Sequence, residues 1–496
     1  MFSGLSRFVV SSALVCAAGV ASPATAGDAA VGAPVAGVDR STVLAPQIDA
    51  LAGGAFFTLA LAADGRVYGT GLNSLGELTG RRPLARGLIM LKGLPVGVRA
   101  TAVAGGYGDA LTVGDDGVAY GAGLNGNGQI TGKRYTWYRL HPLTGLPDGV
   151  RATAVAAGTY HSLVLGDDGV AYGAGDNWSG QLTGPPSNHV RTLVPLTGLP
   201  EGVSATAVAA GNAFSLVLGD DGVAYGTGSN TWGQLTGDEP TLRTLTPLAG
   251  LPEGVSARAI GASPQHSLVV GSDGTAYGAG HNQVAQLTGT DSPRTSLRPL
   301  AGLPGSVRAV GVAPGSKHTL VLGDDGTVYG TGSNADGQLT RQVEFRLTLT
   351  PLRRVEVGVS AVDIAAGYRH SVVLGSDGRA YGTGANGAGQ ISGDLDGIDF
   401  FLPMEWGFAS LTRPVVVGPP RLGFRLTVQQ GRWWPVPVTF AYRWYRDGQP
   451  IPGAVTRTHL LVRADLGARL MVKVTAKAPG VRPGMRLTAR VGPVRR

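Results

Sequence analysis

The sequence predicts an all-β protein, a seven-bladed β-propeller of ~52-residue repeats followed by a small β-sandwich domain. An Asp-Gly-x-x-Tyr-Gly motif recurs seven times, and its tyrosines are 52 or 53 residues apart. A fixed period of this length is typical of an array in which each unit buries its apolar face against its neighbours. Between the motifs the apolar residues alternate with a period of two, which indicates strands, and no stretch has helical periodicity. The pattern changes completely after residue 420.

One repeat shows why each unit should contain four antiparallel strands. Residues 154–158 are short and apolar, and residues 161–165 alternate around branched side chains. Asp168-Gly169 favours a tight hairpin turn because Asp and Gly tolerate positive φ, and residues 170–174 form the return strand. Residues 195–200, with a proline at each end, fit an outer edge strand. Seven such units fit a closed ring, because radial repetition leaves only short, protected edges.

The repeat resembles that of the regulator-of-chromosome-condensation (RCC1) propellers. The resemblance rests on Ala-Ala-Gly-x-x-His-Ser-Leu-Val-Leu, Asp-Gly-x-x-Tyr-Gly-x-Gly and Asn-x-x-Gly-Gln-Leu-Thr-Gly, over roughly residues 44 to 405. It implies the propeller fold. The third strand carries Tyr-Gly where the family often has a tryptophan, so the position stays aromatic. The resemblance says less about function, because one fold hosts many activities.

The chain divides into five predicted segments. They are a secretion signal (1–26), a flexible lead-in (27–43), the propeller (44–412), a linker (413–420) and a basic immunoglobulin-like β-sandwich (421–496). The signal is inferred from a charged start at Arg7, a mostly apolar run and Ala24-Thr-Ala26 as a cleavage site. That run is too short to span a membrane, and no later stretch reaches eighteen apolar residues. The chain's single cysteine, Cys16, lies inside the signal, so we expect no disulfide in the mature protein.

The C-terminal segment resembles the immunoglobulin-like modules at the ends of secreted bacterial surface proteins, with Trp444 as the expected core aromatic. Residues 421–496 contain 15 Lys or Arg and two acids, a net charge of +13, whereas the whole chain carries +8. Such a surface attracts polyanions over about 8 Å at physiological salt. Outside a cell this favours an anionic cell-wall polymer or a membrane surface over nucleic acid. The alternative is that these charges are merely solvated.

The residues that could suggest chemistry are better explained by structure. Phe57, Asp109, His161, Phe214, His266, His318 and His370 occupy equivalent positions in the seven repeats. A shared metal or catalytic role would not tolerate phenylalanine at two of them, so we interpret the histidines as packed and hydrogen-bonded. The Asp-Asp-Gly sequences are interpreted as turns, because no further oxygen ligands for calcium recur nearby. We therefore expect no catalytic residue, no metal and no cofactor.

The variable loop tips are the candidate binding residues. In an antiparallel blade the loops joining strands one and two and strands three and four open on the same face, and there residue identity changes between repeats. A constant frame with variable tips is how rigid scaffolds present binding residues, and aromatic residues and arginine dominate interface hot spots. The alternative is that the aromatic tips only pack against neighbouring loops. The candidate residues are Phe56, Tyr107, Tyr160, Trp178, Trp232, Tyr368 and Arg369.

These observations predict a secreted, monomeric, non-enzymatic interaction protein with an extracellular protein partner and a basic module for attachment to a cell wall or surface. The plan is similar to that of secreted bacterial RCC1-type propellers that inhibit β-lactamases, although those use a shorter repeat. One alternative, implied by the family resemblance, is guanine-nucleotide exchange on a small GTPase. Another is a polysaccharide-acting enzyme, which would need two carboxylates on the variable face, where Asp336 is the only tip acid and Asp109 lies just beyond its loop.

Overall fold

The computed structural model describes residues 47–496 apart from 82, 131, 133–135, 188–189, 341–343, 353–354, 392–397, 405, 408, 411, 432, 435–438 and 479–480. The predicted signal and lead-in therefore lie outside the described residues. Contacts divide the described chain into two units, residues 46–404 and residues 405–496. Each unit is described by itself below. No described helix is long and apolar enough to cross a membrane.

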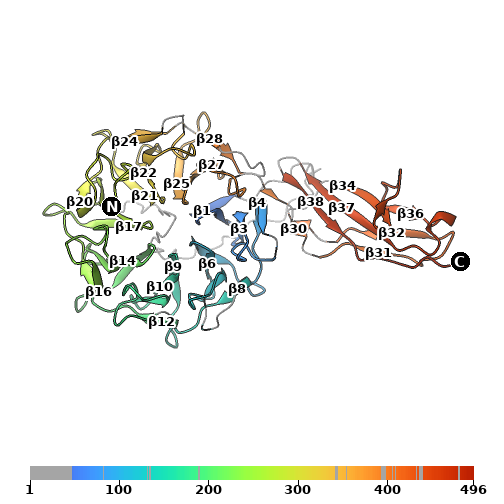
Figure 1. Ribbon diagram of the computed structural model, residues 1–496, viewed down its shortest axis with the longest axis horizontal. Coiled ribbons are helices and arrows are strands. Elements are labelled where there is room, and N and C mark those ends of the chain that lie inside the picture. Colours follow the sequence, from blue (N-terminus) through green and yellow to red (C-terminus); the bar gives the residue numbers. More distant parts are fainter. Residues whose placement is uncertain are drawn as a thin grey trace, which may run out of the picture. The chain divides into compact units, whose positions relative to one another are not determined.

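Within its described residues, the first unit contains the strands β1 to β28, which pair antiparallel in groups of four consecutive strands arranged around a central axis (Figure 1). Each group of four strands is one blade. The first three blades are β1 (Ile48–Gly53), β2 (Phe57–Ala62), β3 (Val67–Leu72) and β4 (Leu84–Met90); β5 (Ala100–Gly105), β6 (Asp109–Gly114), β7 (Ala119–Gly123) and β8 (Trp137–Pro142); and β9 (Ala152–Ala157), β10 (His161–Gly166), β11 (Ala171–Gly175) and β12 (Val190–Pro195).

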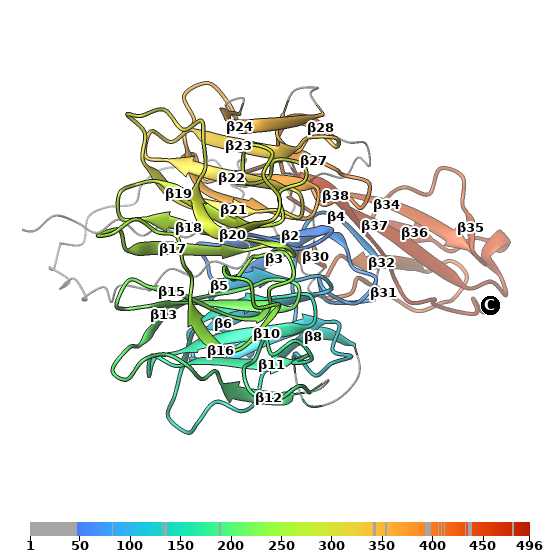
Figure 2. The same ribbon diagram turned by 60° about the vertical axis from the view of Figure 1, so that its left-hand side comes forward.

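The next four blades repeat this order. They are β13 (Ala205–Ala210), β14 (Phe214–Gly219), β15 (Ala224–Ser229) and β16 (Thr241–Pro247); β17 (Ala257–Ala262), β18 (His266–Gly271), β19 (Ala276–Gly280) and β20 (Arg294–Pro299); β21 (Ala309–Pro314), β22 (His318–Gly323), β23 (Val328–Ser333) and β24 (Phe345–Pro351); and β25 (Ala361–Ala366), β26 (His370–Gly375), β27 (Ala380–Gly384) and β28 (Ile398–Pro403). Figure 2 shows β21 to β24 of one blade side by side.

The second and third strands of each blade supply most of the core. Every residue of β10, for example, is buried, and so is every residue of β11. The fourth strand is more exposed, as in β12, where three of six residues are exposed. The fourth strand of this blade is Val190–Pro195 and not residues 195–200 as the sequence suggested. The later segment instead links blades, since the Thr197 carbonyl accepts a hydrogen bond from Leu245 N.

The Asp-Gly and Tyr-Gly motifs are joined by one hydrogen bond. In six blades the tyrosine hydroxyl donates to the carboxylate of the turn aspartate, as from Tyr172 to Asp168 at 2.6 Å. The same aspartate accepts the backbone N–H of Val170 at 3.1 Å. The carboxylate is therefore used inside the turn.

The repeated histidines join neighbouring blades. The Nε2 atom of His161 lies 3.0 Å from Ser215 Oγ of the next blade, and three other pairs repeat this contact: His266 with Thr319, His318 with Ser371, and His370 with Thr58. All four histidines are fully buried. Burial lowers the pKa to about 4 for His161 and His370 and to about 3 for His266 and His318. These side chains are thus neutral links between blades, as the sequence indicated.

The ring closes between the last blade and the first without exchanging a strand. Besides the His370–Thr58 contact, Asp363 of β25 accepts a hydrogen bond from Leu51 N of β1 at 3.2 Å. The other six blades carry alanine or glycine at the position of Asp363. Desolvation raises the pKa of this fully buried carboxyl well above its ordinary value. Residues 47–53 are therefore an ordinary first strand and not a segment added to the last blade.

The second unit is also built from strands. Its elements are β29 (Trp406–Gly407), β30 (Ala409–Ser410), β31 (Val415–Val417), β32 (Arg425–Gln429), β33 (Trp433–Trp434), β34 (Thr439–Arg446), β35 (Gln449–Pro450), β36 (Thr458–Leu460), the 3-10 helix η1 (Arg463–Asp465), β37 (Leu470–Ala478) and β38 (Val481–Leu487). β34, β37 and β38 pair antiparallel, and β31, β32 and β36 form a separate sheet.

Two boundaries differ from the sequence prediction. The first unit ends at Met404 instead of residue 412, because β29 pairs with β38 and β30 pairs with β33. Part of the expected linker is also a strand, since Val415–Val417 pairs with β32. These strands are only two or three residues long, and β29 pairs with residues as distant in the sequence as Val481 and Arg482. As expected, Trp444 is fully buried.

Candidate partner-binding face of the propeller

Four of the predicted tip residues lie one or two positions before the second strand of their blades. Phe56 precedes β2, Tyr107 is in the β5–β6 loop, Tyr160 precedes β10, and Tyr368 is in the β25–β26 loop. The blades concerned are the last and the first three. Because the ring closes, these four blades are consecutive in space, so the four aromatic tips form one half of the mouth around the axis.

The four rings contact one another and form what we term the axial aromatic cluster (Phe56, Tyr107, Tyr160 and Tyr368). The ring centroid of Tyr368 lies 5.7 Å from that of Phe56 and 5.9 Å from that of Tyr107. The centroid of Tyr107 lies 6.5 Å from that of Phe56 and 6.4 Å from that of Tyr160. All four contacts are tilted or edge-on, the geometry that aromatic pairs prefer. Tyr107 and Tyr160 nevertheless remain 37% and 41% exposed.

The backbone fixes the positions of these tips. Tyr107 N donates to the Gly158 carbonyl and Tyr368 N donates to the Ala55 carbonyl, each at 3.3 Å, so neighbouring tips are linked. Only glycine fits at position 158, because a Cβ there would lie 2.5 Å from Cε1 of His161. Desolvation raises the pKa of Tyr368, and the nearby Tyr107 and Tyr160 hydroxyls add to this shift. Tyr368 thus stays neutral over the physiological pH range.

The other half of the mouth has no aromatic residue at these tips. Its tips are Asn212, Ala213, Pro264, Gln265, Ser316 and Lys317. Between the halves lies a small axial cavity of about 50 Å³, lined mainly by glycine, alanine and serine together with Tyr107 and Tyr368. A cavity of this size holds a few water molecules and not a substrate. Recognition at this face would therefore use the surface of the mouth.

The two tryptophans lie on the outer loops of the same face. Trp178, in the β11–β12 loop, is 65% exposed, and this loop is tied to the axial tip of its blade by a 2.9 Å bond from Asp176 N to the Tyr160 carbonyl. Trp232 is only partly exposed and packs edge-on against His281 of the next blade, with ring centroids 4.7 Å apart. The alternative that aromatic tips pack against neighbours thus applies to Trp232 but not to Trp178.

The outer loops contact loops of the following blade: the outer loop with Trp232 meets the outer loop with His281, and the outer loop with Asp336 meets the axial loop with Arg369. The guanidinium of Arg369 lies 3.8 Å from the carboxylate of Asp336, the only tip acid. His281 was missed by the sequence prediction. Its signal was that it is the only histidine at a position otherwise occupied by Leu, Asp, Ser or Ala.

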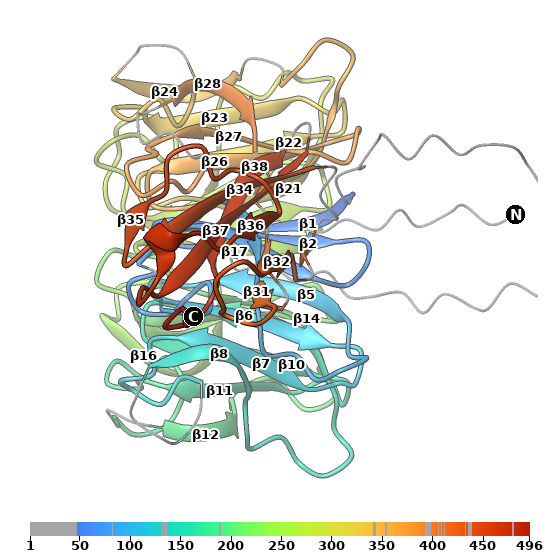
Figure 3. The same ribbon diagram turned by 90° about the vertical axis from the view of Figure 1, so that its right-hand side faces the viewer.

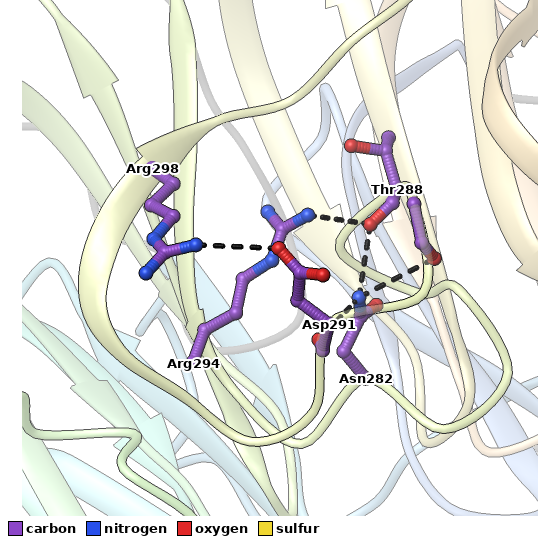
Figure 4. Close-up of polar contacts among 6 residues, drawn as sticks. Asn282, Thr288, Asp291, Arg294 and Arg298 are labelled. Atoms are coloured by element: carbon purple, nitrogen blue, oxygen red, sulfur yellow. Dashed lines mark hydrogen bonds and ion pairs between the residues drawn. The ribbon is translucent and has the colours of Figure 1, made fainter.

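The outer loops are held rigid by the Asn-x-x-Gly-Gln-Leu-Thr-Gly motif. In the fifth blade the Asn282 side chain donates to the carbonyls of Thr288 and Asp291, each at 2.9 Å, and accepts from Leu287 N at 2.7 Å (Figure 4). Nη2 of the buried Arg294 donates to the same Thr288 carbonyl at 2.5 Å. The motif asparagine therefore fixes the loop and leaves the tip free to vary.

No arrangement suited to catalysis is found among the described residues. Asp109 is fully buried in β6, and Asp336 is paired with Arg369, so the two acids cannot act together on a substrate. No group of three or more His, Cys, Asp or Glu in the described part of the chain could hold a metal ion. What the face offers is an exposed aromatic surface on a rigid frame.

Comparison with known proteins agrees with this architecture. A family model described as "Regulator of chromosome condensation (RCC1) repeat" matches residues 48–77, 307–338 and 361–390, and a second model with that description matches residues 325–374. The chain contains RCC1 repeats. The human WBSCR16 crystal structure superposes with a TM-score of 0.62 at 22% identity, over 68% of this chain and 94% of that one. Yeast RCC1 (Prp20), bound to Kap60, gives 0.60 at 18% identity over 76% and 91%. These likenesses confirm the all-β RCC1-like propeller fold.

Two curated relatives each match about half of this chain. The Ultraviolet-B receptor UVR8 of Arabidopsis thaliana is 28% identical over 249 residues, which cover 49% of this chain and 56% of that protein. The Secretion-regulating guanine nucleotide exchange factor of Bos taurus is 29% identical over 251 residues, or 48% of this chain and 53% of that protein. The chain thus spans about half the length of these relatives. RCC1-like homologues include exchange factors and regulators.

Proposed function

We propose that this protein is a secreted, non-enzymatic interaction protein in which a complete seven-bladed ring binds a protein partner through its variable loop face. The observation that carries the proposal is the axial aromatic cluster, in which tips far apart in the sequence form one exposed surface next to Trp178. Exposed aromatic side chains held by a rigid backbone lose little entropy on binding, which suits them as interface anchors.

The second unit completes the proposal. We infer that residues 405–496 form a β-sandwich that attaches the monomeric protein to an anionic cell-wall polymer or surface, and that residues 1–26 direct secretion. The excess of basic residues after position 420 supports attachment. Amino-terminal sequencing of the protein recovered outside the cell tests secretion, and a mature chain that retains residues 1–26 inside the cell would contradict it.

The binding face is tested with variants of the full chain. Tyr107→Ala combined with Tyr160→Ala removes half of the axial aromatic cluster, and Trp178→Ala removes the exposed outer aromatic. Each should leave the unfolding temperature nearly unchanged and weaken capture of the native partner at least tenfold, since hot-spot truncations cost about 2 kcal/mol or more. Val96→Ser is the matched control, because Val96 is fully exposed in a connection that opens on the opposite face. Equal capture by all variants would remove this face from consideration.

A guanine-nucleotide exchange role is the second candidate, and the bovine relative supports it. A yeast Prp20p structure whose description includes binding to Gsp1p and histones also shares the fold, with a TM-score of 0.57 and 20% identity. Release of a fluorescent guanine nucleotide from a panel of small GTPases decides between the candidates. Acceleration by the wild-type chain and not by the Tyr107/Tyr160 variant would favour exchange, and no acceleration would favour the secreted binder.

A further inference from the structure

The pairing of β34, β37 and β38 defines an outward sheet face. Arg443 pairs with Lys473, and Lys473 pairs with Leu487. The adjacent row is Ala441, Thr475 and Met485, because cross-strand partners share a face and side chains alternate along a strand. The intervening residues Trp444, Val472, Val474 and Ala476 are fully buried. Figures 1 and 3 show the three strands side by side. We call Arg443, Tyr445, Met471, Lys473, Lys477, Met485 and Leu487 the basic sheet face.

This face holds positive charge without a compensating acid. Arg443 and Lys473 are directly opposite each other on neighbouring strands, an arrangement that like charges make unfavourable. Neither forms an ion pair within the described residues. The two acids of residues 421–496 are engaged elsewhere: Asp465 with Arg446 and His459, and Asp447 with the backbone N–H of Arg469. An anionic partner would therefore relieve a repulsion that is built into the sheet.

The same face exposes large apolar side chains. Met485 is 55% exposed and Leu487 is 44% exposed. Leu487 lies in the row of Arg443 and Lys473, and Met485 lies in the adjacent row. A polyanionic polymer would need only the positive charges of this face for binding. Apolar side chains interspersed with Lys and Arg on a flat surface are instead suited to a bilayer interface, where cations meet anionic headgroups and apolar groups reach the acyl boundary.

We propose that the basic sheet face docks on an anionic lipid bilayer. This inference rests on the proposed surface attachment and specifies the surface. Arg443, Lys473 and Lys477 would contact lipid phosphates, and Met485 and Leu487 would enter the interface between headgroups and acyl chains. Binding is then peripheral and reversible, because it combines few charges with a small apolar area.

The test is co-sedimentation of the full chain with phosphatidylcholine vesicles that contain either 30% phosphatidylglycerol or none. Wild-type protein should bind the anionic vesicles at 0.1 M salt and bind neutral vesicles much less. Lys473→Glu should weaken binding about thirtyfold, because it changes the charge by two and each charge near the surface is worth about fivefold. This variant should keep its fold, since the introduced carboxylate would lie opposite Arg443 and carry the opposite charge. Arg258→Glu in β17 of the propeller is the control with the same charge change, at an exposed position away from the loop tips, and should bind like wild type.

Met485→Ser with Leu487→Ser separates lipid from polymer. This pair should weaken vesicle binding several-fold and leave retention on an immobilised sulfated polysaccharide unchanged. Vesicle binding that Lys473→Glu does not alter would overturn the assignment to this face. Retention on the polysaccharide without vesicle binding would overturn the bilayer and leave the proposed surface attachment standing. If the chain bound neither the vesicles nor the polysaccharide, both the bilayer proposal and the proposed surface attachment would be overturned. Partner capture by the propeller face is a separate measurement that this outcome would not affect.

Discussion

Lowering the pH should reduce the free energy of unfolding of the propeller because its buried histidines resist protonation. Protonation of a neutral, buried imidazole that accepts or donates one hydrogen bond to the next blade introduces an uncompensated charge into the core. The folded pKa values of His161 and His370 are about 4 and those of His266 and His318 about 3, below the value of about 6.5 for an unfolded chain. A lowered folded pKa stabilises the fold above pH 6.5, and this stabilisation is lost as the pH falls toward the folded value.

The magnitude follows from the same values. Between pH 7 and pH 5, proton uptake on unfolding lowers the free energy of unfolding by about 2 kcal/mol for each histidine. Four histidines together approach the total stability of an ordinary domain, which is about 5–15 kcal/mol. The loss should begin near pH 6.5, before exposed carboxylates titrate, and continue toward the folded pKa values of about 3 to 4.

The assay is urea unfolding at pH 7, 6 and 5 for the wild type and two variants. His318→Phe introduces the residue that the repeats already carry at Phe57 and Phe214, and Ser371 keeps its bond to the Gln338 carbonyl at 2.8 Å. It should reduce the acid-dependent loss by about 2 kcal/mol, and Phe214→His should increase it by a similar amount. An equal loss in all three proteins would refute the assignment of acid sensitivity to these links.

Three further changes test other parts of the chain. Asp109→His should raise the unfolding free energy at pH 7 by about 1–2 kcal/mol in urea titrations. Both Asp109 oxygens and Ser162 Oγ lack partners, and a histidine at position 109 would supply the hydrogen bond to the next blade that is missing here. A lower urea midpoint would show that the site cannot accept the imidazole ring. Asp465→Asn should destabilise the second unit by about 3 kcal/mol, because the Arg446 guanidinium, which lies 2.6 Å from the Asp465 carboxylate, would lose its ion pair. Faster hydrogen exchange confined to residues 405–496 would show this loss of stability. Unchanged protection of these residues would count against the prediction. Trp178→Ala should leave thermal unfolding unaltered, and a clear drop would mean that its ring is not free.

Much of the fold could be predicted from the sequence because each repeat contains motifs that mark its strands and turns. The Asp-Gly and Tyr-Gly motifs mark the second and third strands, and the structure ties them together through the Tyr172–Asp168 bond and its equivalents. The fourth strand was misplaced. Residues 195–200 resemble an edge strand in composition, but the ladder that defines β12 is made by Val190–Pro195. Edge strands carry a weak pattern, because half of their residues face solvent.

The candidate site was only partly predictable for a related reason. Sequence equivalence places all aromatic tips on one face, yet it cannot distinguish a ring that packs from one that protrudes. Trp178 and Trp232 occupy loops of the same kind, and only the second finds a neighbour, His281, at a suitable distance. The grouping of Phe56 with Tyr368 depends on ring closure, which no local pattern specifies. The start of the second unit was predicted too late because β29 and β30 contain only two residues each, too few to show a strand pattern in the sequence.

Each blade is one uninterrupted stretch of chain, and even the junction at Asp363 and Leu51 joins two complete sheets by side-chain and backbone contacts alone. A duplication or deletion of one repeat in the gene would therefore add or remove a whole blade without leaving a half-built sheet behind. For the engineer, the same property means that the ring could be opened between any two blades without dividing a blade.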